Sequence, residues 1–241
     1  MASIAVLQVR EFTVSLNNVQ FQKRRDSAEK LLLLFSWNLW HEFSARLNLQ
    51  PPPLTHATMD VQLRKATLED IPQLQALIDV SVRSLHTKFY TSAQIAGALK
   101  GVYGVDTQVI NDGHYFVVIS PPGAIIACGG WSHRSTLFGS DSYSSRDDDT
   151  LLDPERQSAK IRAMFVHPDW VRKGIGKMIL EAGESAAKEE GFKSMEMSAT
   201  LNGVPFYGKF GYKEVEGGRH EVSLGDGVVI DFYMMRKELV P

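Results

Sequence analysis

The chain has 241 residues, of which 44% are hydrophobic and 22% are charged, and its formal net charge is −2 at pH 7. This composition predicts a globular protein with a large core, and the near-zero charge gives no indication of nucleic-acid binding. The single cysteine, Cys128, excludes an intramolecular disulfide and favours a reducing compartment such as the cytoplasm.

Residues 1–58 differ from the rest of the chain and are predicted to be an extension that precedes one domain over residues 59–241. Within the extension, Asp26–Glu29 predicts the start of a helix that ends before Pro51. Its apolar run is interrupted by polar residues and falls short of the ~20 residues that span a bilayer. Two interpretations stay open. The segment is an amphipathic docking or membrane-surface helix, or it is a poorly ordered extension or gene-model artefact before a natural start at Met59.

The next part of the chain predicts strands and one helix. Their expected limits are Val61–Lys65 for a strand, Thr67–Leu85 for a helix with a capping-box-like start, and Tyr115–Ile119 and Ala124–Trp131 for a hairpin. The hairpin turn is Pro121-Pro122-Gly123, which supplies the required backbone geometry. The long polar stretch that follows, Ser132 to Ala159, is either a lid over a substrate or a solvated insertion.

A glycine loop follows the strand-like run that ends near Val166. The run breaks at Pro168 and restarts as a helix behind Gly174 and Gly176. The first N–H groups of a helix have no intrahelical partners, and the helix dipole is positive there, so this turn predicts an anion site. The nearby cations Arg172, Lys173 and Lys177 favour a phosphate ligand.

Two common nucleotide loops are excluded by spacing. A Walker-type loop requires glycine where Val171 stands and Ser or Thr where Met178 stands. A dinucleotide fingerprint requires glycine or alanine at the position of Ile179. The phosphate ligand is therefore of another class.

Three further elements complete the pattern. From Ile175, apolar residues recur at helical spacing until Gly191, which predicts an amphipathic helix. Ser194–Thr200 alternates apolar and polar residues, as expected for a strand. Val204–Tyr212 follows and contains Phe206, Tyr207, Lys209 and a Gly-aromatic pair.

In this order, the glycine loop, helix, strand and Phe-Tyr helix resemble the GCN5-related N-acetyltransferase (GNAT) family, over about residues 60 to 240. The Cys-Gly-Gly-Trp-Ser run at Cys128–Ser132 is similar to a strand in small acetyltransferase-like members. The loop departs from the family pattern at Val171, where Gln or Arg is usual. The resemblance implies an α/β fold of the α+β type, with a central mixed, mostly antiparallel twisted sheet flanked by helices. It also implies acetyl transfer from acetyl-CoA to an amine by direct attack on the thioester.

The resemblance implies roles for individual residues. Acetyl-CoA is expected to contact Phe165, Val166, Val171, Arg172, Lys173, Gly174, Ile175, Gly176, Lys177 and Phe206. A backbone N–H at Phe165 or Val166 would polarise the thioester carbonyl, and the Tyr207 phenol would protonate the leaving thiolate. A packing role beside Phe206 and Phe210 is the competing interpretation of Tyr207.

The acceptor is left open between a small-molecule amine and a peptide or protein amine. Phe89, Tyr90 and Trp131 lie on segments that line the acceptor side in the family, and Glu196 is a further candidate contact. Glu196 and His133 are both candidate bases, and neither is assigned. Cys128 is either a nucleophile beside His133 or, as we expect, a buried apolar residue.

Catalysis and assembly stay open as well. The protein is either a transferase or a protein that binds acyl-CoA without catalysis, as a sensor or subunit. Whether it forms a homodimer is also left open. No metal ligand spacing and no nucleic-acid partner are expected.

Overall fold

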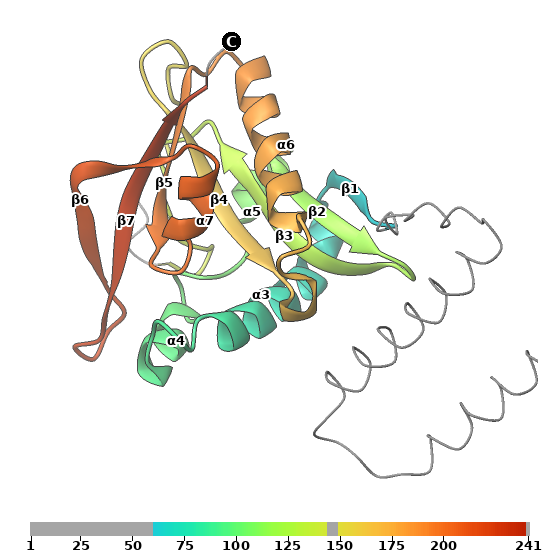
Figure 1. Ribbon diagram of the computed structural model, residues 1–241, viewed down its shortest axis with the longest axis vertical. Coiled ribbons are helices and arrows are strands. Elements are labelled where there is room, and N and C mark those ends of the chain that lie inside the picture. Colours follow the sequence, from blue (N-terminus) through green and yellow to red (C-terminus); the bar gives the residue numbers. More distant parts are fainter. Residues whose placement is uncertain (1–59, 144–148, 240–241) are drawn as a thin grey trace, which may run out of the picture. The chain divides into compact units, whose positions relative to one another are not determined.

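The computed structural model describes residues 60–143 and 149–239 (Figure 1). The helix expected between Asp26 and Pro51 lies outside these residues, and the expected domain limits of 59–241 stay a prediction.

A seven-stranded sheet forms the centre of the described residues, with the order β1-β2-β3-β4-β5-β7-β6. The strands are β1 Gln62–Lys65, β2 Tyr115–Ser120, β3 Ala124–Ser132, β4 Ala159–Val166, β5 Ser194–Thr200, β6 Lys213–Ser223 and β7 Val229–Glu238. Among them β4 and β5 pair in parallel, and all other neighbours pair antiparallel. The expected mixed, mostly antiparallel sheet is therefore confirmed.

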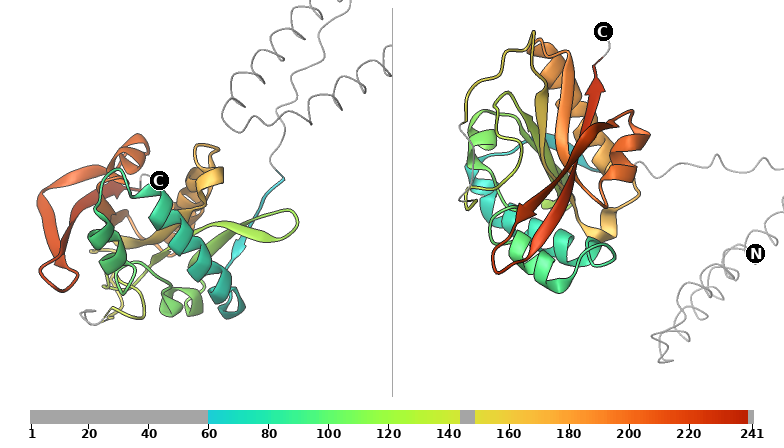
Figure 2. Two further views of the ribbon diagram at one scale, coloured as in Figure 1. Left: turned by 90° about the horizontal axis from the view of Figure 1, so that it is seen from below. Right: turned by 90° about the vertical axis from the view of Figure 1, so that its left-hand side faces the viewer.

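Helices cover both faces of the sheet (Figures 1 and 2). One face carries α3 Ile71–Leu85, α4 Ser92–Ala98 and α5 Thr107–Asn111, and the other carries α6 Ile175–Glu189 and α7 Val204–Lys209. Two short 3-10 turns, η1 Leu68–Asp70 and η2 Pro168–Trp170, precede α3 and α6. Within the described residues, no helix has the length and apolar character needed to cross a membrane.

The helix after the glycine loop has clear physical causes. Gly174 takes the N-cap position with φ +85°, a left-handed conformation that glycine adopts without steric cost. Ile175, Ile179 and Leu180 are buried against the sheet, which is the apolar stripe that the sequence predicts. The chain leaves the helix at Gly191, whose φ is +89°.

β4 and β5 separate soon after they begin. They pair at Ala159 with Met195 and at Lys160 with Glu196, and beyond these residues the two described strands form no further pair. An irregularity in the β3–β4 register falls just beyond Arg162, and Ala163 has φ +46°. Such a bulge bends a strand, so it contributes to the divergence of β4 from β5.

Candidate active site

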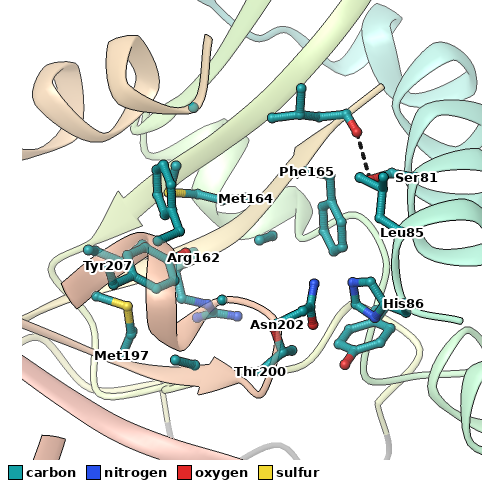
Figure 3. A pocket seen from close by; sticks show the side chains of 18 of the residues that line it. Ser81, Leu85, His86, Arg162, Met164, Phe165, Met197, Thr200, Asn202 and Tyr207 are labelled. Carbon is teal, nitrogen blue, oxygen red and sulfur yellow. Dashed lines mark hydrogen bonds between the residues drawn. The ribbon is translucent and has the colours of Figure 1, made fainter. Parts of the chain in front are cut away.

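A cavity of about 650 Å³ lies where β4 and β5 diverge (Figure 3). Its walls include Ile161–Val166 of β4 and Met197–Thr200 of β5, together with residues of α3, α7 and the loop before α6. The two strands therefore bring distant parts of the chain to one cavity. Strand pairing cannot fill this space because the backbones have moved apart.

The N-terminus of α6 opens into the cavity. The first intrahelical bond runs from the Met178 N–H to the Gly174 carbonyl, with an N···O distance of 3.1 Å. The N–H groups of Ile175, Gly176 and Lys177 precede that bond and so have no acceptor within the helix. Gly174, Ile175 and Gly176 all line the cavity, which makes this end suited to an anion.

Cationic side chains surround the same helix end. Arg172, Lys177 and Lys209 line the cavity, and Lys177 also lies 3.4 Å from Glu181. Lys209 was not among the ligand contacts that we predicted from the sequence. The Lys173 ammonium instead lies over the Trp170 ring, 4.8 Å from its centroid, and Lys173 does not line the cavity. The structure thus brings nine of the ten expected cofactor contacts to one cavity.

Tyr207 lies on α7 and faces the cavity in which Met164 and Met197 also lie (Figure 3). Its ring is half-buried and packs edge-on against Phe206, with the centroids 5.1 Å apart. Burial raises the pKa of the Tyr207 phenol above its usual value, because a phenolate would lose hydration there. The phenol therefore keeps its proton at physiological pH and is available as a donor.

The backbone at the end of β4 also faces the cavity. The His167 N–H donates to the Ile126 carbonyl of β3 at 2.8 Å, and peptide groups alternate in direction along a strand. The polar groups of Val166 therefore face the open edge of β4, and its carbonyl accepts a hydrogen bond from Ser81 Oγ at 2.9 Å. Of the two expected carbonyl-polarising positions, Val166 is the one whose N–H this geometry directs toward the cavity.

The four expected acceptor contacts lie outside the cavity lining. The exposed fraction of Phe89 is 46%. Tyr90 is buried, and its hydroxyl accepts a hydrogen bond from the Leu201 N–H at 2.7 Å. This bond holds the turn between β5 and α7 against the segment that follows α3, so Tyr90 supports the cavity without lining it.

The arrangement of the sheet explains why Trp131 and Glu196 do not line the cavity. Trp131 is fully buried on the α6 face and stacks on His114 with centroids 4.1 Å apart. Glu196 forms an ion pair with Lys160 at the start of β4 and β5, where the two strands still pair. The cavity begins beyond the Lys160–Glu196 pair, so the Glu196 side chain does not line the cavity.

The two remaining candidates, His133 and Cys128, are also distant from the cavity lining. His133 lies beside Glu190 and Asp112, at N···O distances of 3.1 and 3.6 Å. Cys128 is fully buried under the Tyr115 hydroxyl, and burial raises the pKa of its thiol to about 12. A thiol that stays protonated and buried matches the expected apolar role rather than a nucleophile.

Part of the polar stretch after β3 forms a wall of the cavity. Arg162 donates hydrogen bonds to the carbonyls of Thr136 at 2.8 Å and Gly139 at 2.9 Å, and it pairs with Asp106 at 2.6 Å. Leu137, Phe138 and Gly139 consequently line the cavity. The solvated-insertion interpretation does not hold for these residues.

Comparisons with known proteins agree with this geometry. Residues 152–239 match the family model of the acetyltransferase (GNAT) domain. PaiA N-acetyltransferase from Thermoplasma acidophilum, solved in complex with coenzyme A, is 16% identical with a TM-score of 0.51, over 75% of this chain and 99% of that one. A GCN5-related N-acetyltransferase from Rhodopseudomonas palustris is 20% identical with a TM-score of 0.54, over 76% and 99%.

A third structure, an N-acetyltransferase from Staphylococcus aureus Mu50, is 14% identical with a TM-score of 0.50, over 75% of this chain and 99% of that one. At such identities the structures show a shared fold, and the matched family model adds the family. Both agree with the resemblance that the glycine loop and the Phe-Tyr helix carry. The chain therefore contains a GNAT-family N-acetyltransferase domain.

Proposed function

We propose that this domain transfers the acetyl group of acetyl-CoA to an amine by direct attack on the thioester. The observation that carries the proposal is a single cavity in which a helix N-terminus, an outward-facing strand N–H and the Tyr207 phenol all meet. The coenzyme A complex of the similar Thermoplasma acidophilum enzyme supports the choice of cosubstrate.

Each part of this cavity suits one part of acetyl-CoA. The phosphates would bind at the N-terminus of α6, where the N–H groups of Ile175, Gly176 and Lys177 lack helical acceptors and Arg172 adds positive charge. The thioester would then lie beside β4, where the Val166 N–H would donate a hydrogen bond to the carbonyl oxygen. This donor would stabilise the oxyanion that forms during attack.

The reaction forms one bond and breaks another. The amine nitrogen bonds to the acetyl carbon, the carbon–sulfur bond breaks, and the thiolate needs a proton to leave as a thiol. Tyr207 is the proposed donor, because its raised pKa keeps the phenol protonated and because it lines the cavity. The amine must reach the carbonyl in its neutral form, with a free lone pair on its nitrogen.

The test is thiol release from acetyl-CoA with a panel of amines, comparing the parent protein with Tyr207→Phe. We expect turnover to fall by about 10²–10⁴-fold while the acetyl-CoA dissociation constant stays within about twofold, since the ring and its packing on Phe206 are kept. Cofactor affinity is measured separately by calorimetry.

Two results would contradict parts of this proposal, and a third would identify the class of acceptor. Tight acetyl-CoA binding without thiol release for any small, peptide or protein amine would favour a sensor or subunit that binds without catalysis. Normal turnover in Tyr207→Phe would assign thiolate protonation to water and leave Tyr207 a packing residue. Acetylation confined to peptide or protein amines would identify a macromolecular acceptor.

A further inference from the structure

Three buried polar atoms without hydrogen-bond partners meet on the α3 side of the cavity. They are His86 Nδ1, the Tyr103 hydroxyl and Asn202 Oδ1, and within the described part of the chain nothing bonds to them. All three residues line the cavity, and His86 and Tyr103 are 6% and 7% exposed. An unpaired buried polar group destabilises a folded protein, so a lining that gathers three of them indicates a polar ligand.

These residues come from three separate segments that the fold holds firmly together. His86 ends α3, Tyr103 follows α4, and Asn202 lies between β5 and α7. The rings of His86 and Tyr103 meet edge-on with centroids 5.3 Å apart, and Figure 3 shows Asn202 beside His86. The hydrogen bond from the Leu201 N–H to Tyr90 joins two of the segments.

The chemistry of the three groups matches a primary amine. Asn202 Oδ1 and an unprotonated imidazole nitrogen accept N–H hydrogen bonds, and the Tyr103 hydroxyl can donate or accept. His86 is also the C-terminal cap of α3, where the negative end of the helix dipole favours a positive charge. This helix end would offset part of the cost that burial imposes on a protonated imidazole.

The charge of the lining limits which charged groups an acceptor molecule can carry into the cavity. None of the described residues that line the cavity is Asp or Glu, and the Arg162 guanidinium is paired with Asp106. Burial lowers the pKa of His86 to about 4, and the rings that face it, Tyr90 and Tyr103, are also uncharged near neutral pH. A further cationic group on the acceptor would find no counter-ion among these residues.

The shape and polarity of the neighbouring wall complete the description. Aromatic and aliphatic side chains line the same cavity as the three polar groups, namely Leu85, Val102, Phe138, Phe165 and Phe232. Tyr103 packs edge-on against Phe165 and Phe232, with centroids 6.1 and 6.4 Å apart. These rings would bury an apolar acceptor body, and a carboxylate would lose its hydration against them.

We propose that this part of the cavity binds the acceptor, a primary monoamine with an uncharged apolar body, and that His86 takes the proton lost by its nitrogen. The inference rests on the proposed transferase function. As the nitrogen bonds to the acetyl carbon, it becomes acidic and passes one proton to the imidazole. Tyr207 gives one proton to the departing thiolate, and exchange with water returns both groups to their starting states. The products are an acetamide and coenzyme A.

The first test compares three amines of graded charge with the full-length protein: 2-phenylethylamine, phenylalanine and spermidine. We expect kcat/KM for 2-phenylethylamine to exceed that of the other two by about tenfold or more. Spermidine carries further cations for which the described lining has no carboxylate, and the phenylalanine carboxylate would lose hydration beside the aromatic wall. A preference for phenylalanine or spermidine would overturn the inference and leave the transferase function intact.

The second test uses variants that remove one polar group each. Tyr103→Phe and Asn202→Ala should raise KM for 2-phenylethylamine about tenfold, with the acetyl-CoA dissociation constant unchanged. His86→Phe keeps an aromatic ring without a basic nitrogen and should lower kcat about a hundredfold. Tyr233→Phe is the matched control, because this tyrosine lies outside the cavity lining, and it should behave as the parent protein.

Direct binding separates failure of this inference from failure of the transferase proposal. Calorimetry measures 2-phenylethylamine binding to the protein–coenzyme A complex. If the amine binds there and Tyr103→Phe weakens binding about tenfold, the site stands even when no transfer occurs. If the amine does not bind, or the three variants bind and react as the parent does, the inference is wrong.

Discussion

At the scale of single residues, the contrast between Gly176 and Arg172 bears on how the proposed phosphate site would be held. Both line the cavity, but Gly176 contributes backbone and space while Arg172 contributes an exposed charge. A Cβ atom at Gly176 would lie 3.2 Å from two ring atoms of Phe206, so a side chain there competes with both the ring and the ligand. The space above this glycine is therefore part of the site.

Gly176→Val should weaken coenzyme A binding about a hundredfold, whereas Arg172→Ala should weaken it no more than about fivefold. A branched side chain fills the space at the helix end, and one exposed charge contributes at most ~1 kcal/mol. Calorimetry with coenzyme A measures both. Gly208→Ala is the control, since a Cβ there meets no atom of the described chain within 4 Å. Equal losses for the two variants would mean that side chains hold the phosphates.

At the scale of elements, a buried ion pair holds one wall of the cavity in place. The side chains of Arg162 and Asp106 are 2% and 0% exposed, and Arg162 also binds the carbonyls of Thr136 and Gly139. These bonds join β4 to the start of α5 and to the segment that follows β3. One guanidinium thus binds the carbonyls on both sides of Leu137 and Phe138 in the cavity wall.

Arg162→Met should destabilise the protein by about 3–5 kcal/mol, because it leaves the Asp106 carboxylate buried without its cation. Arg83→Met removes a cation from the exposed pair with Asp79, whose side chains are 56% and 51% exposed, and should cost less than ~1 kcal/mol. Urea unfolding of both variants measures the difference. Similar losses for the two variants would show that the buried pair does not hold the wall.

At the scale of the whole molecule, buried histidines couple folding to pH. Burial lowers the pKa of both His86 and His114, so each prefers to be neutral when folded and takes up a proton more readily when unfolded. His114 also faces Glu190, Asp112 and His133, and the two carboxylates partly offset the effect of burial. The stabilisation from these groups is present above the unfolded pKa near 6.5 and is lost as the pH falls.

For His86 the folded pKa is about 4, so its contribution should disappear progressively between pH 6.5 and 4. A shift of this size corresponds to about 3 kcal/mol in the free energy of unfolding. The stability difference between the parent protein and His86→Phe, followed by urea unfolding across this range, isolates the contribution of His86 from that of other titrating groups. A difference that does not change with pH would show that His86 is hydrated in the folded protein.

Features that depend on adjacent residues were predictable from the sequence. Gly174 and Gly176 predict the helix start because backbone freedom and N-terminal N–H groups are local properties. The Pro-Pro-Gly hairpin turn and the apolar stripe of α6 were likewise predicted from local residue patterns, and the short helix that carries Tyr207 was predicted from its resemblance to a family signature. Together these features were sufficient to indicate the family and the anion end of the cavity.

The acceptor side was decided by tertiary structure, because it depends on which distant strands and turns meet. Trp131 turns to the α6 face after an irregularity in the β3–β4 register, and Glu196 meets Lys160 where β4 and β5 still pair. His86, Tyr103 and Asn202 are far apart in the chain and show no common spacing. The sequence by itself predicted the fold and the proposed cofactor end, through local patterns and a family resemblance, whereas the divergence of β4 from β5 placed the side chains that the proposed acceptor would meet.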